Sequence, residues 1–154
     1  MKEYFKSVFE TDEKDYYCVW YADINSGFAT EKDHVVCFSD PAVLEGYCRG
    51  KGISLSKETM IFNLSSLMEF AVGLTNDFVA SEVLNFWNAC SDLAFTLKLE
   101  FSGDDDNDAL EELYDTLFIM GSEPGTELTE DDIADLREVI KDGCQLVTEN
   151  LFAA

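Results

Sequence analysis

The amino-acid sequence predicts an α/β fold, with α+β as the alternative: a small N-terminal sheet and a mostly helical C-terminal half. Two observations lead to this prediction. Runs rich in β-branched and aromatic residues end by Leu64, whereas apolar residues after Leu64 recur at helical spacing. The length of 154 residues suits one domain with a sizeable core, so we expect a single domain over residues 1–154.

The first two strands are predicted from short aromatic and β-branched runs. Tyr16–Asp23 (YYCVWYAD) is typical of a strand that is covered on both faces. The residues INSG follow as a turn, in which Gly27 is free to take a positive φ. His34–Ser39 (HVVCFS) is a second strand, which we expect to be the hairpin partner of the first.

A helix and a third strand come next. Asp40 is a good N-cap and Pro41 suits the first helical position, while Gly50 or Gly52 ends the helix. Thr59–Leu64 (TMIFNL) is the third strand. Because a helix connects the second and third strands, we expect those two to pair in parallel.

After Leu64 the pattern is helical. Ser66 and Glu69 match a capping box, and Gly73 closes that short helix. Ser81–Phe101 is long and apolar on most sides, so it is predicted to be the central core helix. Its expected buried stripe contains Val83, Phe86, Trp87, Cys90, Leu93, Ala94 and Leu97.

Two more helices complete the prediction. The first begins in the acidic stretch FSGDDDNDALEELYD, where Asp104 or Asp106 is the expected cap. Its expected inner face contains Leu110, Leu113, Leu117 and Met120. Thr129 and Asp132 cap the last helix. The expected inner face of that helix contains Ile133, Leu136, Ile140, Val147 and Leu151.

The charge balance is strongly acidic and uneven. The formal net charge is -22, of which residues 61–154 contribute -18. Such a surface repels nucleic acid and anionic lipid and attracts basic proteins. It also keeps a protein dissolved without any partner, so charge alone leaves both explanations open.

The acidic stretch matches a calcium loop of the EF-hand type only in part. Asp104, Asp106 and Asp108 match positions one, three and five of that motif. However, Ala109 stands where a glycine is needed for the sharp turn, and Asp115 is too short for the bidentate Glu position. The sequence therefore disfavours an EF-hand, and we expect no cofactor.

The same carboxylates form either a solvated helix face or a docking face for a basic partner. Acids in a first helical turn are stabilised by the helix dipole. Like charges four residues apart, such as Glu111 and Asp115 or Asp131 and Asp135, are instead destabilising, and their presence favours a docking role. The candidate partner-binding residues are Asp104, Asp105, Asp106, Asp108, Glu111, Glu112, Asp115, Asp131, Asp135, Glu138 and Asp142.

The sequence contains no catalytic signature. The single histidine, His34, is three residues from Cys37 on a predicted strand, so their side chains point to opposite faces. Phosphate-loop, nucleophile-elbow and CxxC motifs are absent. We therefore expect no enzyme. The five cysteines are expected to be buried, reduced thiols of a cytoplasmic protein: Cys18, Cys37, Cys48, Cys90 and Cys144.

The run HVVCFSDPAVLEGYCRGKGISLSKETMIFNLSSLMEF, residues 34–70, resembles the strand–helix–strand–helix pattern of bacterial toxin immunity proteins. More narrowly, it resembles small acidic immunity proteins of contact-dependent growth inhibition systems. This resemblance implies a cytoplasmic, non-enzymatic protein that binds one cognate toxin domain, one to one, and transfers no individual site residue.

Three functions therefore stay open at this stage. The leading one is an immunity or inhibitor protein for a basic toxin domain, for example a nuclease, with no nucleic-acid or membrane partner. The alternatives are a regulatory module that binds divalent cations and a small carboxylate-dependent enzyme.

Overall fold

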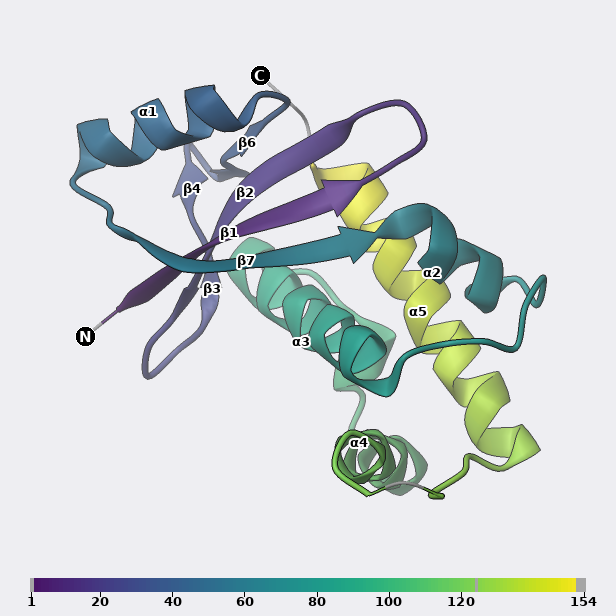
Figure 1. The fold of residues 1–154 in the computed structure, drawn as a ribbon. Coiled ribbons are helices and arrows are strands. Elements are labelled where there is room, and N and C mark those ends of the chain that lie inside the picture. Colours follow the sequence, from purple (N-terminus) through teal and green to yellow (C-terminus); the bar gives the residue numbers. More distant parts are fainter. Residues whose placement is uncertain (1, 124, 152–154) are drawn as a thin grey trace.

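A mixed β-sheet and five α-helices make up the residues described by the structure, a computed structural model that covers residues 2–123 and 125–151. The strands come from the N-terminal part of the chain, and four of the five helices follow the last strand. The predicted α/β class is confirmed. Figure 1 shows the sheet between helix α1 on one side and helix α3 on the other.

The main sheet has the strand order β3-β2-β1-β7, with β6 also paired to β2. Its strands are β1 (Glu3–Glu10), β2 (Asp15–Ala22), β3 (Gly27–Phe28), β6 (Cys37–Phe38) and β7 (Leu55–Asn63). A separate two-stranded ribbon joins β4 (Thr30–Glu31) to β5 (His34–Val35).

The central strand β1 was not predicted, and its presence corrects the expected pairing. The third predicted strand belongs to β7, which runs parallel to β1 and not to the His34–Ser39 segment. Lys6 and Ser7 interrupt the apolar pattern of β1 in the sequence. In the structure, the buried Ser7 hydroxyl donates to the carbonyl of Cys18 at 3.3 Å, which satisfies a polar group in the core.

The predicted hairpin of the first two strands is only partly correct. The segment His34–Ser39 is divided between β5 and β6, and only β6 pairs with β2. That pairing is antiparallel and places Cys37 opposite Cys18. The short strand β3 lies between β2 and β6 in sequence and also pairs with β2.

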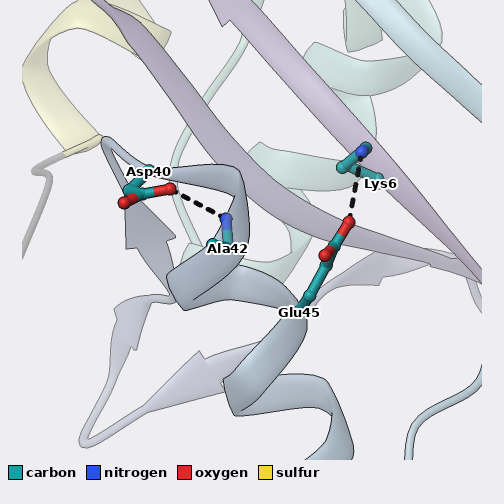
Figure 2. A network of polar contacts seen from close by, with 4 residues as sticks. All are labelled: Lys6, Asp40, Ala42 and Glu45. Carbon is teal, nitrogen blue, oxygen red and sulfur yellow. Dashed lines mark hydrogen bonds and ion pairs between the residues drawn. The ribbon is translucent and has the colours of Figure 1, made fainter.

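Helix α1 (Pro41–Lys51) starts and ends as predicted. Asp40 accepts a hydrogen bond from the backbone N–H of Ala42 at 2.9 Å (Figure 2), and Gly52 caps the C-terminus with φ of 70°. The Lys6 ammonium lies 3.8 Å from the Glu45 carboxylate, which connects β1 to α1 (Figure 2). Both partners are partly exposed, so this pair contributes little to stability.

The C-terminal helices are α2 (Leu64–Ala71), α3 (Ala80–Leu97), α4 (Asp108–Met120) and α5 (Glu130–Asn150). The capping box predicted at Thr129 and Asp132 is present. The cap of α2 is Asn63 and not Ser66, because the Ser66 backbone N–H donates to the Asn63 side chain. Helix α3 ends before the predicted Phe101, since Lys98 takes the left-handed conformation.

Each sheet face packs on its own apolar cluster. On the α1 side, Val19, Leu44 and Cys48 are buried together. On the other side, residues such as Phe9, Phe62 and Phe86 join the strands to α2, α3, α4 and α5. Over the described residues, no helix has the length and hydropathy needed to cross a membrane.

Candidate functional site

The acidic stretch of the sequence folds as a short link between α3 and α4. Phe101 is buried and anchors the link, and a single 3-10 turn, η1 (Ser102–Asp104), follows it. Helix α4 then starts at Asp108, where the Asn107 side chain accepts from the N–H groups of the first turn. The cap is therefore Asn107, and not the predicted Asp104 or Asp106. An amide is as good a cap as a carboxylate because only its oxygen is used.

This link and α4 border an open hollow of about 500 Å³, here named the acidic hollow. Its lining contains five of the predicted partner-binding residues and no Lys or Arg. The lining residues are Trp87, Asn88, Ser91, Gly103, Asp104, Asp105, Asp106, Leu110, Glu111, Tyr114 and Asp115. The fold thus gathers carboxylates from η1, the link and α4 around one depression.

Aromatic and amide groups from α3 and α4 form the rest of the lining. The rings of Trp87 and Tyr114 meet edge to face with centroids 5.5 Å apart. The Trp87 indole N–H donates to the Gly103 carbonyl at 3.2 Å, and the Tyr114 hydroxyl donates to Asn88 at 2.7 Å. The Ser91 hydroxyl donates to the Asp104 carboxylate at 2.5 Å. These hydrogen bonds hold the inner part of the acidic hollow in place.

The remaining predicted residues lie outside this lining. Asp108 and Glu112 are exposed on α4. Asp131 and Glu138 are exposed on α5, and Asp135 is half-buried there. These five carboxylates do not line the acidic hollow.

Asp142 differs from the other predicted residues because the fold uses it. Its carboxylate accepts from the backbone N–H of Ser102 at 2.8 Å, and its side chain is half-buried. It therefore ties α5 to η1.

The geometry of the carboxylates bears on cation binding. Within residues 2–123 and 125–151, no group of three or more His, Cys, Asp or Glu side chains is arranged to hold a metal ion. The stretch from Asp104 to Asp115 is divided between a 3-10 turn, a cap and a helix. An EF-hand loop needs those same positions in one continuous turn around the ion.

Sequence reasoning missed one polar site on the sheet. The Trp20 indole N–H donates to the Asp92 carboxylate at 2.7 Å, across the layer between β2 and α3. Burial raises the pKa of Asp92, and the Trp20 hydrogen bond only partly opposes this rise. Asp92 sits on the polar-looking side of the α3 pattern, so its spacing carried no signal of this contact.

All five cysteines are free and buried, as predicted. Cys18 and Cys37 face each other across β2 and β6. Burial raises the pKa of Cys144 to about 12 and also raises the pKa of Cys90. A thiol that stays protonated in an apolar core is a poor nucleophile. His34 is exposed, whereas Cys37 is buried.

Comparison with known proteins yields one structural likeness. No protein-family model matches the chain, and no curated protein matches it. A crystal structure of the SatS C-terminal domain in complex with bromine is similar, with a TM-score of 0.59 and 12% sequence identity. The match covers 99% of this chain and 94% of that chain. At this identity the likeness shows a shared fold.

Proposed function

We propose that this chain binds a basic protein domain through the acidic hollow and the carboxylates around it, and that it thereby inhibits that domain. The observation that carries the proposal is the lining of the acidic hollow: five carboxylates, no basic residue and two aromatic rings. An extended acidic helix face would spread these charges over solvent. Their convergence gives a cationic side chain several acceptors at once.

The proposed contact is specific for arginine or lysine side chains. A guanidinium group binds carboxylates through two parallel N–H donors and stacks on aromatic faces. Asp105 and Asp106 are exposed and offer carboxylates, while Tyr114 offers a half-buried ring beside them. A partner that inserts one Arg here would satisfy both preferences in one place.

Long-range electrostatics support fast capture of such a partner. The net charge of -18 in residues 61–154 lies in the half of the chain that carries the acidic hollow. Complementary charge steers association to about 10⁸–10⁹ M⁻¹s⁻¹ at low salt. Rapid binding is what an inhibitor of a harmful basic domain, such as a nuclease with a phosphate-binding groove, requires.

The resemblance of residues 34–70 to toxin immunity proteins supports the proposal that this inhibitor is an immunity protein, with one cognate toxin domain as its partner. The matching experiment is co-expression in a bacterial host. The test strain produces the C-terminal domain of a large secreted toxin, taken from the gene immediately upstream if that gene encodes one, with or without this chain.

The proposal predicts that the toxin domain alone arrests growth and that the chain restores it. It also predicts that the two proteins copurify as an equimolar complex at low salt. Growth arrest that persists despite a folded, expressed chain would overturn the immunity function. Restored growth without a complex would instead point to another mode of protection, such as enzymatic inactivation of the toxin's product.

A further inference from the structure

Strand β7 forms an open edge of the main sheet. In the part of the chain that the structure describes, β7 pairs with β1 on one side and with no strand on the other. A strand edge carries a row of backbone N–H and C=O groups that can pair with another extended segment. Figure 1 shows β7 at the border of the sheet, running directly into α2.

The two halves of the β7 edge differ in how well they are protected from pairing with another strand. In the first half the register with β1 shifts between Tyr4 and Lys6, whose partners on β7 are Leu55 and Thr59. This irregularity contains Lys57 and Glu58, and both a bulge and charged side chains discourage edge pairing. The second half, from Thr59 to Asn63, pairs regularly with β1 and carries Met60, Ile61 and Phe62.

A groove of about 460 Å³, here named the edge groove, opens beside this second half. Ile61, Phe62 and Asn63 all line it. Successive side chains of a strand point to opposite faces, so a groove that meets three consecutive residues reaches the strand edge. It lies at the C-terminal end of β7, where Glu10 of β1, the partner of Asn63, also lines it. Phe70 on α2 and Phe78 before α3 supply apolar walls.

The wall that contains Phe78 is held in place by Arg137 on α5. Its guanidinium donates to the carbonyl oxygens of Phe70 at 3.0 Å and Thr75 at 3.2 Å, and to the Asn76 side chain at 2.7 Å. Phe78 also packs on Phe70, with ring centroids 5.2 Å apart. The segment before α3 that borders the edge groove is therefore held in place by hydrogen bonds from Arg137.

The rim of the edge groove indicates the charge of its occupant. Glu10, Asp77 and Glu82 line it, and no Lys or Arg does. Two apolar side chains of the groove are strongly exposed, Ile61 at 58% and Val79 at 54%. A second copy of this chain would bring another net charge of -22 against this rim, so self-association is disfavoured.

We propose that the edge groove binds an extended peptide segment of another protein, which adds a strand to β7 over Thr59–Asn63. Its backbone pairs with the free edge, and an apolar side chain enters the groove. A neighbouring Lys or Arg of the segment meets Glu10, Asp77 or Glu82. Strand addition uses main-chain bonds for affinity and side-chain pockets for selectivity. This site is separate from the acidic hollow and does not depend on the function proposed for it.

The test starts from a random peptide library displayed on phage and selected on the immobilised full chain. The expected consensus contains alternating β-branched or aromatic residues with adjacent Lys or Arg. A synthetic peptide of that consensus is then titrated into the ¹⁵N-labelled chain. Slowed amide hydrogen exchange at residues 59–63 is the expected signature, because new strand pairing protects edge amides.

Two variants and one control complete the experiment. Ile61→Asp with Val79→Asp, both at exposed positions, and separately Asp77→Lys with Glu82→Lys, are each expected to weaken peptide binding at least about tenfold. Glu3→Gln with Asp33→Asn, two exposed carboxylates that line neither the edge groove nor the acidic hollow, is expected to leave peptide binding unchanged.

Four results would overturn the proposal: no peptide enriched, binding unaffected by either groove variant, protected amides confined to other elements, or a dimer of this chain that buries β7. The circular dichroism spectrum of each variant confirms that it is folded before binding is compared.

Discussion

The carboxylate of Asp142 on α5 accepts a hydrogen bond from the backbone N–H of Ser102, with 2.8 Å between the two atoms. This contact joins helix α5 to the start of η1, which borders the acidic hollow. The next residue, Gly103, lies so close to Phe101 and Trp87 that an added Cβ would stand 2.6 Å and 2.7 Å from their rings. The inner border of the acidic hollow is therefore set by packing within the fold.

We expect Asp142→Ala to destabilise the protein by about 1–3 kcal/mol, because the half-buried Ser102 N–H loses a charged acceptor. Urea denaturation measures this loss. Faster amide exchange at Asp104 and Asp105, whose N–H groups bond to Phe101 and Ser102, should accompany it. Asp142→Asn retains an acceptor oxygen and should recover part of the stability. Equal exchange rates in wild type and Asp142→Ala would show that Asp142 does not hold η1.

Gly143→Ala tests the contact between α5 and α3. A Cβ at this position would lie 2.8 Å from the Cys90 sulfur and 2.9 Å from the Phe86 ring. We expect a loss of about 1–3 kcal/mol from overpacking. The matched control is Gly46→Ala in α1, whose Cβ would meet only the flexible Arg49 side chain at 3.8 Å. That change should stabilise by about 0.5–1 kcal/mol, since alanine is the better helix former. Gly143→Ala that stabilised as much as the control would contradict the packing.

The burial of the Asp92 carboxyl predicts a pH-dependent stability. Because burial raises the pKa of Asp92 above its ordinary value of 3.8, the folded state binds the Asp92 proton more tightly than the unfolded state. The contribution of Asp92 to the free energy of unfolding therefore falls as pH rises from about 3.8 through the folded-state pKa. At neutral pH the ionised carboxylate costs stability.

Asp92→Asn keeps an acceptor for Trp20 and removes the charge, so it should be more stable than wild type at neutral pH. The advantage should shrink as pH falls through that window. Urea denaturation of both proteins over a pH series measures the difference. An advantage that stays constant across the series would show that ionisation of Asp92 is not its cause.

Arg137→Lys should loosen the segment between α2 and α3. The Arg137 guanidinium reaches Phe70, Thr75 and Asn76 together and lies over the Phe70 ring at 5.1 Å. An ammonium group lacks this planar set of donors, so we expect a loss of about 1–2 kcal/mol. Amide exchange over residues 72–79 should accelerate. A variant with wild-type stability and exchange would show that water replaces these contacts without cost.

Much of the fold was predictable because local chemistry decided it. The Asp40 and Pro41 start of α1 and the Thr129 capping box depend on neighbouring residues, and both predictions are confirmed. Of the two glycines predicted to end α1, Gly50 and Gly52, the structure uses Gly52. Strand β1 was missed because its pattern is interrupted by Ser7, which only the contact with Cys18 makes compatible with the core. Because β1 was missing from the prediction, the His34–Ser39 segment was wrongly expected to be the parallel partner of β7.

The site was predictable in part for the same reason. Acid density pointed to the stretch that borders the acidic hollow. Which carboxylates converge depends on how α4 packs against α3, and sequence spacing carries no such information. Asp142 shows what sequence spacing cannot predict. Asp142 and Glu138 belong to the same acidic pattern on α5, yet Asp142 bonds to Ser102 and Glu138 is exposed.

The role of the acidic hollow in binding a basic partner is tested with two variants that change the net charge equally. The first removes four carboxylates at the link and the start of α4 and leaves the Asn107 cap in place: Asp104→Asn, Asp105→Asn, Asp106→Asn and Asp108→Asn. Asparagine at 104 retains an acceptor for Ser91. The second removes four exposed carboxylates of the N-terminal half: Glu3→Gln, Glu13→Gln, Asp33→Asn and Glu58→Gln.

The decisive measurement is the association rate of wild type and both variants with the toxin domain proposed as the partner, over a series of salt concentrations. We expect the first variant to associate about tenfold more slowly at low salt and with a flatter salt dependence. The second variant should stay close to wild type. Equal rates and equal salt dependence for the two variants would contradict the proposed role of the acidic hollow.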